Sequence, residues 1–200
     1  MSSIYKLIGF TQPTSFEFTK QNMKKVEEIL KKYPNQNKRS AVMPLLHLAQ
    51  EQNNNWVPKA AMDYIAKLLD LTPMQVYEVA NFYTMYNKQP VGDNLIQVCR
   101  TTPCWLSGSN KITEICKKKL GIDIGETTND KQFTLVEVEC LGACVNAPVV
   151  QINNDYYEDL SPEKMDAVLE SITNNRKIAH GSQSGRLNSA PEGWIAKPKN

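Results

Sequence analysis

Four of the five cysteines in this chain fall into two close pairs, and this spacing restricts the fold more than any other feature. Four residues separate Cys99 from Cys104, three separate Cys140 from Cys144, and 35 lie between the pairs. Thiolates four or five positions apart converge on one centre when the chain between them turns. The spacing therefore predicts a fold in which two distant loops meet to form a four-sulfur site.

Four interpretations of these cysteines are open: two disulfides, a redox dithiol, a structural zinc site and an iron–sulfur cluster. Residues 1–20 contain no apolar stretch long enough for a signal peptide, and disulfides are rare in the cytosol, so disulfides are not favoured. A thioredoxin-type dithiol needs two residues between its cysteines, and neither pair has that spacing. Zinc and an iron–sulfur cluster both remain open on spacing alone.

The residues around the cysteines favour a functional cluster over structural zinc. Zinc-stapled modules are typically small and polar, whereas these cysteines end apolar, strand-like runs in a chain of 200 residues. A chain of this length can bury a core without a metal, so its metal centre is expected to have a function. Pro103 prevents a regular strand ladder at the first pair, and Gly142 permits a tight turn at the second.

Composition describes an ordinary soluble protein with little net charge. There are 23 basic and 21 acidic side chains, and 41% of the residues are apolar. This balance provides no field that would attract the phosphates of a nucleic acid. No apolar run approaches the length of a membrane span, so membrane association is expected to come through partners.

Residues 19–88 have the apolar spacing of four short amphipathic helices, which would form a small docking bundle. The expected helix starts are Thr19, Ser40, Pro58 and the pair Thr72-Pro73, with Pro34 ending the first helix and Pro44 in the first turn of the second. The positions expected to face inward are Met23, Val26, Ile29, Leu30 and Tyr33; Leu45, Leu46, Leu48 and Ala49; Ala61, Met62, Ile65, Leu68 and Leu69; and Val76, Val79, Ala80 and Tyr83. His47 lies on a largely apolar helix and is expected to have no catalytic role.

From Asn94 the spacing changes to that of strands. Strands are expected at 95–99, at 133–139 with alternating burial, and at 148–152. The last of these is expected to return through a turn to a partner strand at Tyr156-Tyr157. Helices are expected from Ser107 or Ser109 to Leu120 and from Ser161 through Ile172. The order β-α-β-β-α is the reduced thioredoxin topology, with a mixed sheet and helices packed on it. Because both cysteine pairs follow strands, their loops are expected to meet at one end of the sheet, near the surface.

The expected fold class is α+β, with four regions along the chain. These are an extended N-terminal arm at 1–18, a helical bundle at 19–90, a thioredoxin-like domain at 91–174 and an extended or disordered tail at 175–200. Trp194 is the one large apolar anchor of the tail, and nothing near His180 makes it a ligand. The fifth cysteine, Cys116, lies on the apolar stripe of its helix and is expected to be a core residue, not a ligand.

A resemblance to a known family rests on the residues around the cysteines. The segments VCRTTPCWLSGS and VEVECLGACVNAPVVQIN, the latter followed after two residues by YYEDL, closely resemble the thioredoxin-like [2Fe–2S] subunit of respiratory complex I, the NADH:ubiquinone oxidoreductase, of the flavoprotein-2 type. The segments KRSAVMPLLHLAQEQNNNWVP, YEVANFYTMY and GRLNSAPEG extend the likeness to roughly residues 20–190. It covers most of the chain.

The resemblance implies a cofactor, a ligand set and partners. One [2Fe–2S] cluster per chain would be held by Cys99, Cys104, Cys140 and Cys144, next to the FMN of a flavoprotein subunit that binds NADH, with the iron–sulfur subunit of the peripheral arm as a further partner. The chain itself contains no Gly-rich dinucleotide or Walker motif and no His/Glu constellation for acid–base work. Enzyme activity is therefore expected of the assembly, with no catalytic residue and no complete active site in this chain.

The chemistry expected of the chain is one-electron transfer. An oxidised all-cysteine [2Fe–2S] cluster carries a charge of about −2 and its reduced form about −3, at potentials of about −400 mV in plant-type ferredoxins. The added charge would be stabilised by backbone N–H groups of the cysteine loops, by the hydroxyls of Thr101 and Thr102, and by the cation of Arg100.

Two alternative functions stay open, and so does the location. One is the diaphorase subunit of an NAD-linked hydrogenase or formate dehydrogenase, and the other is a zinc-stabilised adaptor. Residues 1–18 contain one Lys and no Arg, which is a poor mitochondrial presequence. The expected location is the cytoplasmic side of the bacterial inner membrane, attached through the complex, with the mitochondrial matrix side as the alternative.

Overall fold

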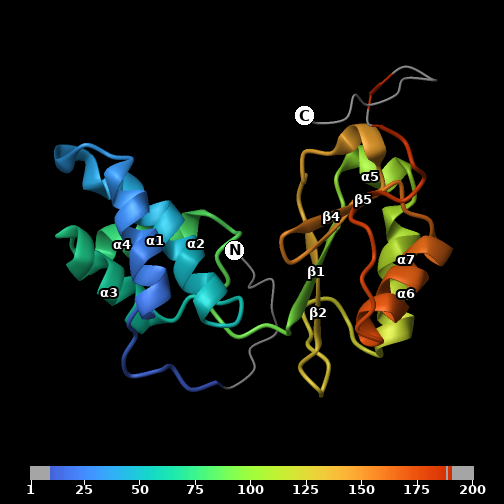
Figure 1. The fold of residues 1–200 in the computed structure, drawn as a ribbon. Helices are drawn as coiled ribbons and strands as arrows, with labels where there is room; N and C mark the ends of the chain where they lie inside the picture. Colours follow the sequence, from blue (N-terminus) through green and yellow to red (C-terminus); the bar gives the residue numbers. More distant parts are fainter. Residues whose placement is uncertain (1–9, 188, 191–200) are drawn as a thin grey trace. The chain divides into compact units, whose positions relative to one another are not determined.

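The computed structural model describes residues 10–187, 189 and 190 (Figure 1). The chain forms two compact units. One is a helical unit, Leu7–Asp93, and the other is a sheet unit whose described part begins at Asn94.

The helical unit packs short helices around one apolar core. Its elements are α1 (Lys20–Lys31), a 3-10 helix η1 (Asn35–Ala41), α2 (Val42–Gln52), α3 (Lys59–Leu69) and α4 (Pro73–Phe82). Leu45, Leu46 and Ile65 are fully buried at its centre. Each helix contributes an apolar face, so the bundle predicted from the spacing of apolar residues is confirmed.

Two of the predicted helix starts are held by local hydrogen bonds. The Thr19 hydroxyl accepts a hydrogen bond from the backbone N–H of Asn22 at 3.2 Å, which caps α1. Pro73 is the first residue of α4, and the N–H of Thr72 donates to the Gln75 side-chain oxygen at 2.9 Å. These starts depend on residues a few positions apart, which is why the sequence predicts them.

Two predictions for the bundle are wrong. Ser40 does not cap α2, because the chain enters that helix through η1 and the cap residue, Ala41, already has helical backbone angles. Tyr83 is 37% exposed because α4 ends at Phe82 and Tyr83 has an extended backbone. Tyr86 is the buried tyrosine instead, and its hydroxyl donates to the carbonyl of Met43 at 3.0 Å.

The described part of the predicted N-terminal arm, residues 10–18, has no helix or strand and packs on the bundle. Phe18 is 6% exposed, and its ring and that of Phe16 meet Tyr64 edge to face. The Gln52 amide donates to the carbonyl of Glu17 at 2.8 Å. The arm is therefore part of the helical unit's core; residues 1–9 lie outside the described residues.

The sheet unit contains a mixed five-stranded sheet in the order β2-β1-β3-β4-β5. Its strands are β1 (Asn94–Cys99), β2 (Phe133–Val138), β3 (Val150–Ile152), β4 (Asp155–Glu158) and β5 (Gly181–Ser182). β1 and β2 are parallel, β3 is antiparallel to both β1 and β4, and β5 is parallel to β4. The predicted mixed sheet with a returning hairpin is confirmed.

Helices α6 (Ser109–Leu120) and α7 (Pro162–Thr173) lie side by side beside the sheet (Figure 1). The Ser161 hydroxyl accepts from the N–H of Lys164 and caps α7, as predicted. Ile96, Leu135 and Leu169 are fully buried between helices and sheet. Cys116 belongs to the same core with no exposed surface, so its predicted burial is confirmed.

Two local features of the sheet unit differ from expectation. A short helix, α5 (Thr102–Leu106), follows β1. Pro103 lies in its first turn, where proline is favoured, so the residue that ends the strand also starts a helix. The first four residues of β2 are all buried instead of alternating. The segment before β2 pairs with the edge of this strand that β1 leaves open: the Thr127 and Thr134 hydroxyls are 2.8 Å apart, and the N–H of Leu135 donates to the carbonyl of Glu126.

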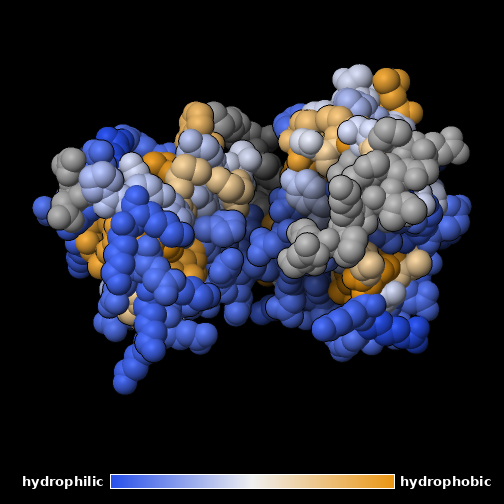
Figure 2. Space-filling model, turned by 45° about the horizontal axis from the view of Figure 1, so that its top comes forward, coloured by the Kyte–Doolittle hydropathy of each residue, from blue (hydrophilic) through white to orange (hydrophobic). Residues whose placement is uncertain are grey.

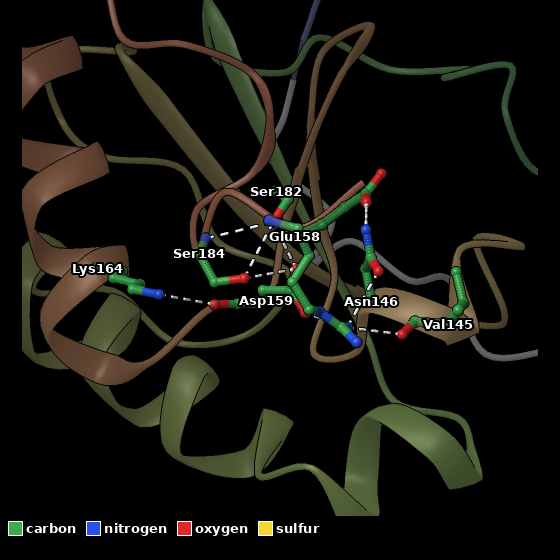
Figure 3. A network of polar contacts seen from close by, with 8 residues as sticks. Val145, Asn146, Glu158, Asp159, Lys164, Ser182 and Ser184 are labelled. Carbon is green, nitrogen blue, oxygen red and sulfur yellow. Dashed lines mark hydrogen bonds and ion pairs between the residues drawn. The ribbon is translucent and has the colours of Figure 1, made fainter. Parts of the chain in front are cut away.

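Residues 181–187, predicted to lie in an extended or disordered tail, are joined to the sheet unit. Asp159, which follows β4, receives hydrogen bonds from the hydroxyls of Ser182 and Ser184 at 2.6 and 3.1 Å (Figure 3). The Arg186 guanidinium also donates to Asp159, from Nη2 at 2.5 Å and from Nε at 3.2 Å. Trp194, the predicted anchor, lies outside the described residues.

The Asp159 carboxylate is expected to make stability depend on pH. Burial alone would raise its pKa, but hydrogen bonds from Arg186 and two serines outweigh burial and lower the pKa. A carboxyl whose pKa is lower in the folded state stabilises the fold above its unfolded pKa, and that stabilisation is lost as the pH falls through the folded value. Asp159→Asn is expected to cost about 1–2 kcal/mol at pH 7.

The measurement is urea unfolding of the wild type and Asp159→Asn at several pH values between 7 and 2.5. The stability difference between the two proteins is expected to shrink at the acid end, because the wild-type carboxyl then also loses its charge. Asp70→Asn is the control, since Asp70 is an exposed aspartate with a left-handed backbone at the end of α3, a conformation that asparagine also adopts. A difference for Asp159→Asn that stays constant across the range would contradict this account.

Candidate metal centre

The ends of β1 and β2 bring the two cysteine pairs to one edge of the sheet. The strands are parallel, with Cys99 opposite Val138, so their carboxyl ends coincide. Cys99 is the last residue of β1, and Cys104 follows within α5. Cys140 follows β2 by two residues, and Cys144 begins a short 3-10 helix, η2 (Cys144–Asn146). The predicted meeting of the two loops at one end of the sheet is confirmed.

The first pair is buried. Cys99 and Cys104 are each 1% exposed and pack with Val149. The Thr101 hydroxyl lies 3.3 Å from the Cys99 sulfur. Burial raises the pKa of Cys104 to about 12, and the hydrogen bond with Cys99 acts in the same direction.

The second pair is exposed and lies in a tight turn. The sulfurs of Cys140 and Cys144 are 3.4 Å apart, and the N–H of Gly142 donates to the Cys140 sulfur at 3.4 Å. Gly142 has φ of +82°, which a side chain disfavours, so the glycine permits this turn. The Gly142 hydrogen bond, followed by that from Cys144, lowers the pKa of Cys140, whereas the hydrogen bond with Cys140 raises the pKa of Cys144.

The two pairs are linked to one another by hydrogen bonds. Burial alone would raise the pKa of Cys99, but hydrogen bonds from the Thr101 hydroxyl and from the backbone of Leu141, in the second loop, lower it. The Thr101 hydroxyl also reaches Cys140 and lowers its pKa. The Thr101 hydroxyl therefore lowers the pKa of one thiol in each pair, so the two pairs are coupled electrostatically.

This donor set fits a [2Fe–2S] cluster. Such a cluster takes four cysteine thiolates, and the structure presents them as two pairs on two adjoining loops. N–H and O–H groups aimed at the sulfurs are the contacts that favour added negative charge. Among residues 10–187, 189 and 190, the structure shows no group of three or more His, Cys, Asp or Glu side chains placed to bind a single metal ion.

Arg100 and Thr102, which the sequence analysis names as stabilising the reduced cluster, are both exposed. The Arg100 guanidinium is 3.8 Å from the Glu137 carboxylate and its side chain is 61% exposed, so its charge is partly offset. Thr102 is exposed at the start of α5. Their roles toward the cluster stay predictions.

Sequence reasoning missed two supports of the site. The Tyr156 hydroxyl donates to the carbonyl of Leu141 at 2.8 Å and so fixes the second cysteine loop. Val149 contacts the buried pair, and its backbone lowers the pKa of Cys104 against the larger effect of burial. Both contacts join segments that only the folded sheet brings together, so no short motif in the sequence marks them.

A comparison with protein-family models decides the family. Residues 26–173 match the model of the thioredoxin-like [2Fe-2S] ferredoxin. The chain belongs to that family. Membership in the thioredoxin-like [2Fe-2S] ferredoxins confirms the predicted α+β fold and the [2Fe–2S] cluster as its cofactor, in preference to zinc. The assignment of the four ligands to numbered cysteines stays a prediction.

Similar proteins are named as parts of NADH-quinone oxidoreductase and of NADH dehydrogenase. A subunit of the NADH-quinone oxidoreductase of Rickettsia bellii is 58% identical over 165 residues, which is 82% of this chain and 99% of that protein. The mitochondrial NADH dehydrogenase [ubiquinone] flavoprotein 2 of Dictyostelium discoideum is 54% identical over 173 residues, which is 86% of this chain and 70% of that protein. These relatives confirm the predicted resemblance to a subunit of an oxidoreductase complex.

Among solved structures, an NAD+-reducing [NiFe]-hydrogenase in its H2-reduced state is similar in fold. It superposes with a TM-score of 0.57 at 21% identity, covering 67% of this chain and 23% of the hydrogenase chain. This chain therefore spans about a quarter of that hydrogenase chain. At such low identity the likeness shows a shared fold alone.

Proposed function

We propose that this chain is the one-electron transfer subunit of an NADH:quinone oxidoreductase, with a [2Fe–2S] cluster held by Cys99, Cys104, Cys140 and Cys144. The observation that carries the proposal is the convergence of two cysteine pairs at the ends of β1 and β2, in a chain of the thioredoxin-like [2Fe-2S] ferredoxin family. Relatives named as subunits of NADH-quinone oxidoreductase support the choice of complex.

The residues of the chain would bind and tune the cofactor. When bound, the cluster supplies a centre that accepts and returns one electron. The thiolates hold it, and the N–H groups of Gly142 and Leu141 and the hydroxyl of Thr101 donate hydrogen bonds to sulfur. These donors stabilise the additional negative charge of the reduced state.

The surface around the site supports a partner that docks there. Cys140 and Cys144 are exposed, and three large apolar side chains on the cysteine loops, Trp105, Leu106 and Val145, are 55%, 72% and 50% exposed. Hydrophobic patches also interrupt the mostly hydrophilic surface of both units (Figure 2). Exposed apolar groups that surround a functional site are typical of an interface.

We assign this interface to a flavoprotein subunit that binds FMN and NADH, because the sequence of this chain contains no dinucleotide-binding motif of its own. The iron–sulfur subunit of the peripheral arm is the further partner. No helix in the described part of the chain is long and apolar enough to cross a membrane. The proposed location is peripheral, on the cytoplasmic side of the bacterial inner membrane, with the mitochondrial matrix side as the alternative.

A second candidate function is the diaphorase subunit of an NAD-linked hydrogenase or formate dehydrogenase. The fold shared with the NAD+-reducing hydrogenase is compatible with it. The NADH:quinone oxidoreductase assignment is preferred because the relatives named for NADH-quinone oxidoreductase and NADH dehydrogenase are more than twice as similar in sequence, at 58% and 54% against 21% identity.

Affinity purification from native membranes distinguishes the two functions. A tagged copy of the chain is expected to co-purify with an FMN-containing subunit and with membrane-spanning subunits, and the eluate is expected to reduce quinone with NADH. The control is a tagged variant that lacks the second ligand pair, Cys140→Ser/Cys144→Ser. It shows whether the subunits assemble without the cluster. Recovery of a soluble complex that reduces NAD+ with hydrogen or formate would favour the diaphorase function.

The Thr101 hydroxyl is expected to raise the reduction potential of the cluster. It lies 3.3 Å from the Cys99 sulfur and also reaches Cys140, so its loss removes a donor that favours the reduced state. Thr101→Val is expected to lower the midpoint potential by roughly 20–60 mV, the equivalent of one hydrogen bond. Redox titration followed by EPR measures it, and Thr14→Val, at an exposed threonine of the helical unit, is the control. An equal shift in both variants would contradict the assignment.

A further inference from the structure

The C-terminal segment contacts the loop that carries Cys144 through one arginine. The Arg186 Nη2 donates to the carbonyl of Val145 at 2.8 Å and to the side-chain oxygen of Asn146 at 3.0 Å. Val145 and Asn146 are the two residues that follow Cys144 within η2. One guanidinium nitrogen therefore contacts two consecutive residues next to a proposed ligand, from a segment far along the sequence.

Asn146 makes this contact rigid. Its side chain has no exposed surface, and its Nδ2 donates to the Glu158 carboxylate at 2.6 Å (Figure 3). Its backbone carbonyl accepts from the N–H of Asp159 at 2.7 Å. Each polar group of the Asn146 side chain thus has a partner from β4 or from Arg186, so the end of the Cys144 turn is held against the sheet.

The orientation of Arg186 is fixed in turn by Asp159. The carboxylate accepts from both Nε and Nη2 of Arg186 on one oxygen and from the hydroxyls of Ser182 and Ser184 on the other. The backbone N–H of Arg186 donates to the Ser182 hydroxyl at 3.1 Å. Figure 3 shows Asp159 between the two serines and the Val145-Asn146 pair. The Asp159 side chain is 9% exposed, so the anchor of the arginine is itself nearly buried.

We propose that Arg186 is a positioning residue for the Cys144 ligand turn, an inference that rests on the proposed ligand role of Cys144. Cys144 is exposed and begins η2, which is a single short turn, so its sulfur is held by what fixes the residues on either side. Gly142 donates to Cys140 on the N-terminal side, and Arg186 fixes Val145 and Asn146 on the C-terminal side.

The planar guanidinium is needed for this role. Arg186 uses donors of fixed mutual direction to contact a carboxylate, a carbonyl and an amide oxygen together. A lysine at the same position would keep the charge but would provide a single ammonium group without that geometry. The contact thus ties the C-terminal segment to the metal centre, although the segment contributes no ligand.

The first test uses the apoprotein, so it does not depend on a bound cluster. Hydrogen exchange of the Asn146 and Ala147 amides, which donate to the carbonyls of Ala143 and Cys144, reports on the turn. Arg186→Gln is expected to speed exchange at these amides by roughly tenfold, with little change in β1 or α6. Arg176→Gln, which alters an exposed arginine after α7, is the matched control. Unchanged exchange in Arg186→Gln would overturn the proposal.

The second test uses the cluster-loaded chain. In Arg186→Gln, the EPR spectrum of the reduced protein is expected to broaden and shift, and the cluster is expected to be lost several-fold faster to a chelator. Arg186→Lys is expected to restore overall stability to unfolding without restoring the spectrum. An EPR spectrum and a loss rate equal to those of the wild type in both variants would overturn the positioning role.

The two tests separate this proposal from the proposed function. If the wild-type chain binds no [2Fe–2S] cluster, the ligand assignment fails, and with it the positioning role, even when hydrogen exchange shows that Arg186 holds the turn. If the wild-type chain binds the cluster and the Arg186 variants match it in both tests, only the role of Arg186 fails.

Discussion

Replacing Cys140 by serine is expected to remove the [2Fe–2S] cluster or to leave it too unstable to purify. Thiolates bind iron, and a serine hydroxyl near neutral pH does not ionise to an equivalent ligand. The loss is expected because Cys140 is one of the four proposed ligands, and its sulfur already accepts a hydrogen bond from the N–H of Gly142 at 3.4 Å. Visible absorption and the iron content of the anaerobically purified variant measure the effect.

Cys116→Ser is the matched control for this substitution. Cys116 lies on α6 and is fully buried in the core of the sheet unit, and burial raises the pKa of its thiol to about 12. A hydroxyl there is expected to cost about 1–3 kcal/mol of stability and to leave the cluster spectrum unchanged. A Cys116→Ser protein without visible absorption beside a Cys140→Ser protein that retains it would contradict the ligand assignment.

Truncation of Leu169 to alanine is expected to produce the largest stability loss among the changes considered. Leu169 lies on α7, has no exposed surface and packs in the core that also contains Ile96 and Leu135. Removing its methyl groups leaves a cavity that neighbours on both helices and the sheet cannot fill, which costs about 3–4 kcal/mol. For a domain of ordinary stability, this is a large fraction of the free energy of unfolding.

Urea unfolding of the full chain, followed by circular dichroism, checks this expectation. Leu106→Ala is the matched control, because Leu106 is 72% exposed and its truncation is expected to change stability by less than about 0.5 kcal/mol. Similar losses in the two variants would show that α7 does not pack on the sheet as described.

The sequence predicted the elements whose determinants are local. Thr19 and the pair Thr72-Pro73 start helices through hydrogen bonds or backbone angles set within three residues, and those starts were correct. The predicted cap at Ser40 was wrong, because capping depends on the direction from which the chain enters the helix and η1 changes that direction. Pro103 was interpreted as a strand breaker, although a proline also suits the first turn of a helix such as α5.

The site was only partly visible in the sequence, for a related reason. Cysteine spacing marks the proposed ligands, because ligand pairs must lie close in the chain to bind together. The donors and supports come from tertiary structure: Tyr156 reaches the second loop from β4, and Arg186 reaches it from the C-terminal segment. The polar, aperiodic composition after residue 174 indicated a tail, since single-residue anchors such as Arg186 leave no periodic pattern.

The most direct test of the central claim is a spectrum with a metal count on the same sample. The anaerobically purified chain is examined by visible absorption and EPR before and after dithionite, and its iron, sulfide and zinc are counted. A chain that holds one [2Fe–2S] cluster is expected to show absorption that bleaches on reduction, a spin-one-half signal, and about two irons and two sulfides per chain. A colourless, EPR-silent protein that contains one zinc would contradict it and would make the four cysteines a structural site.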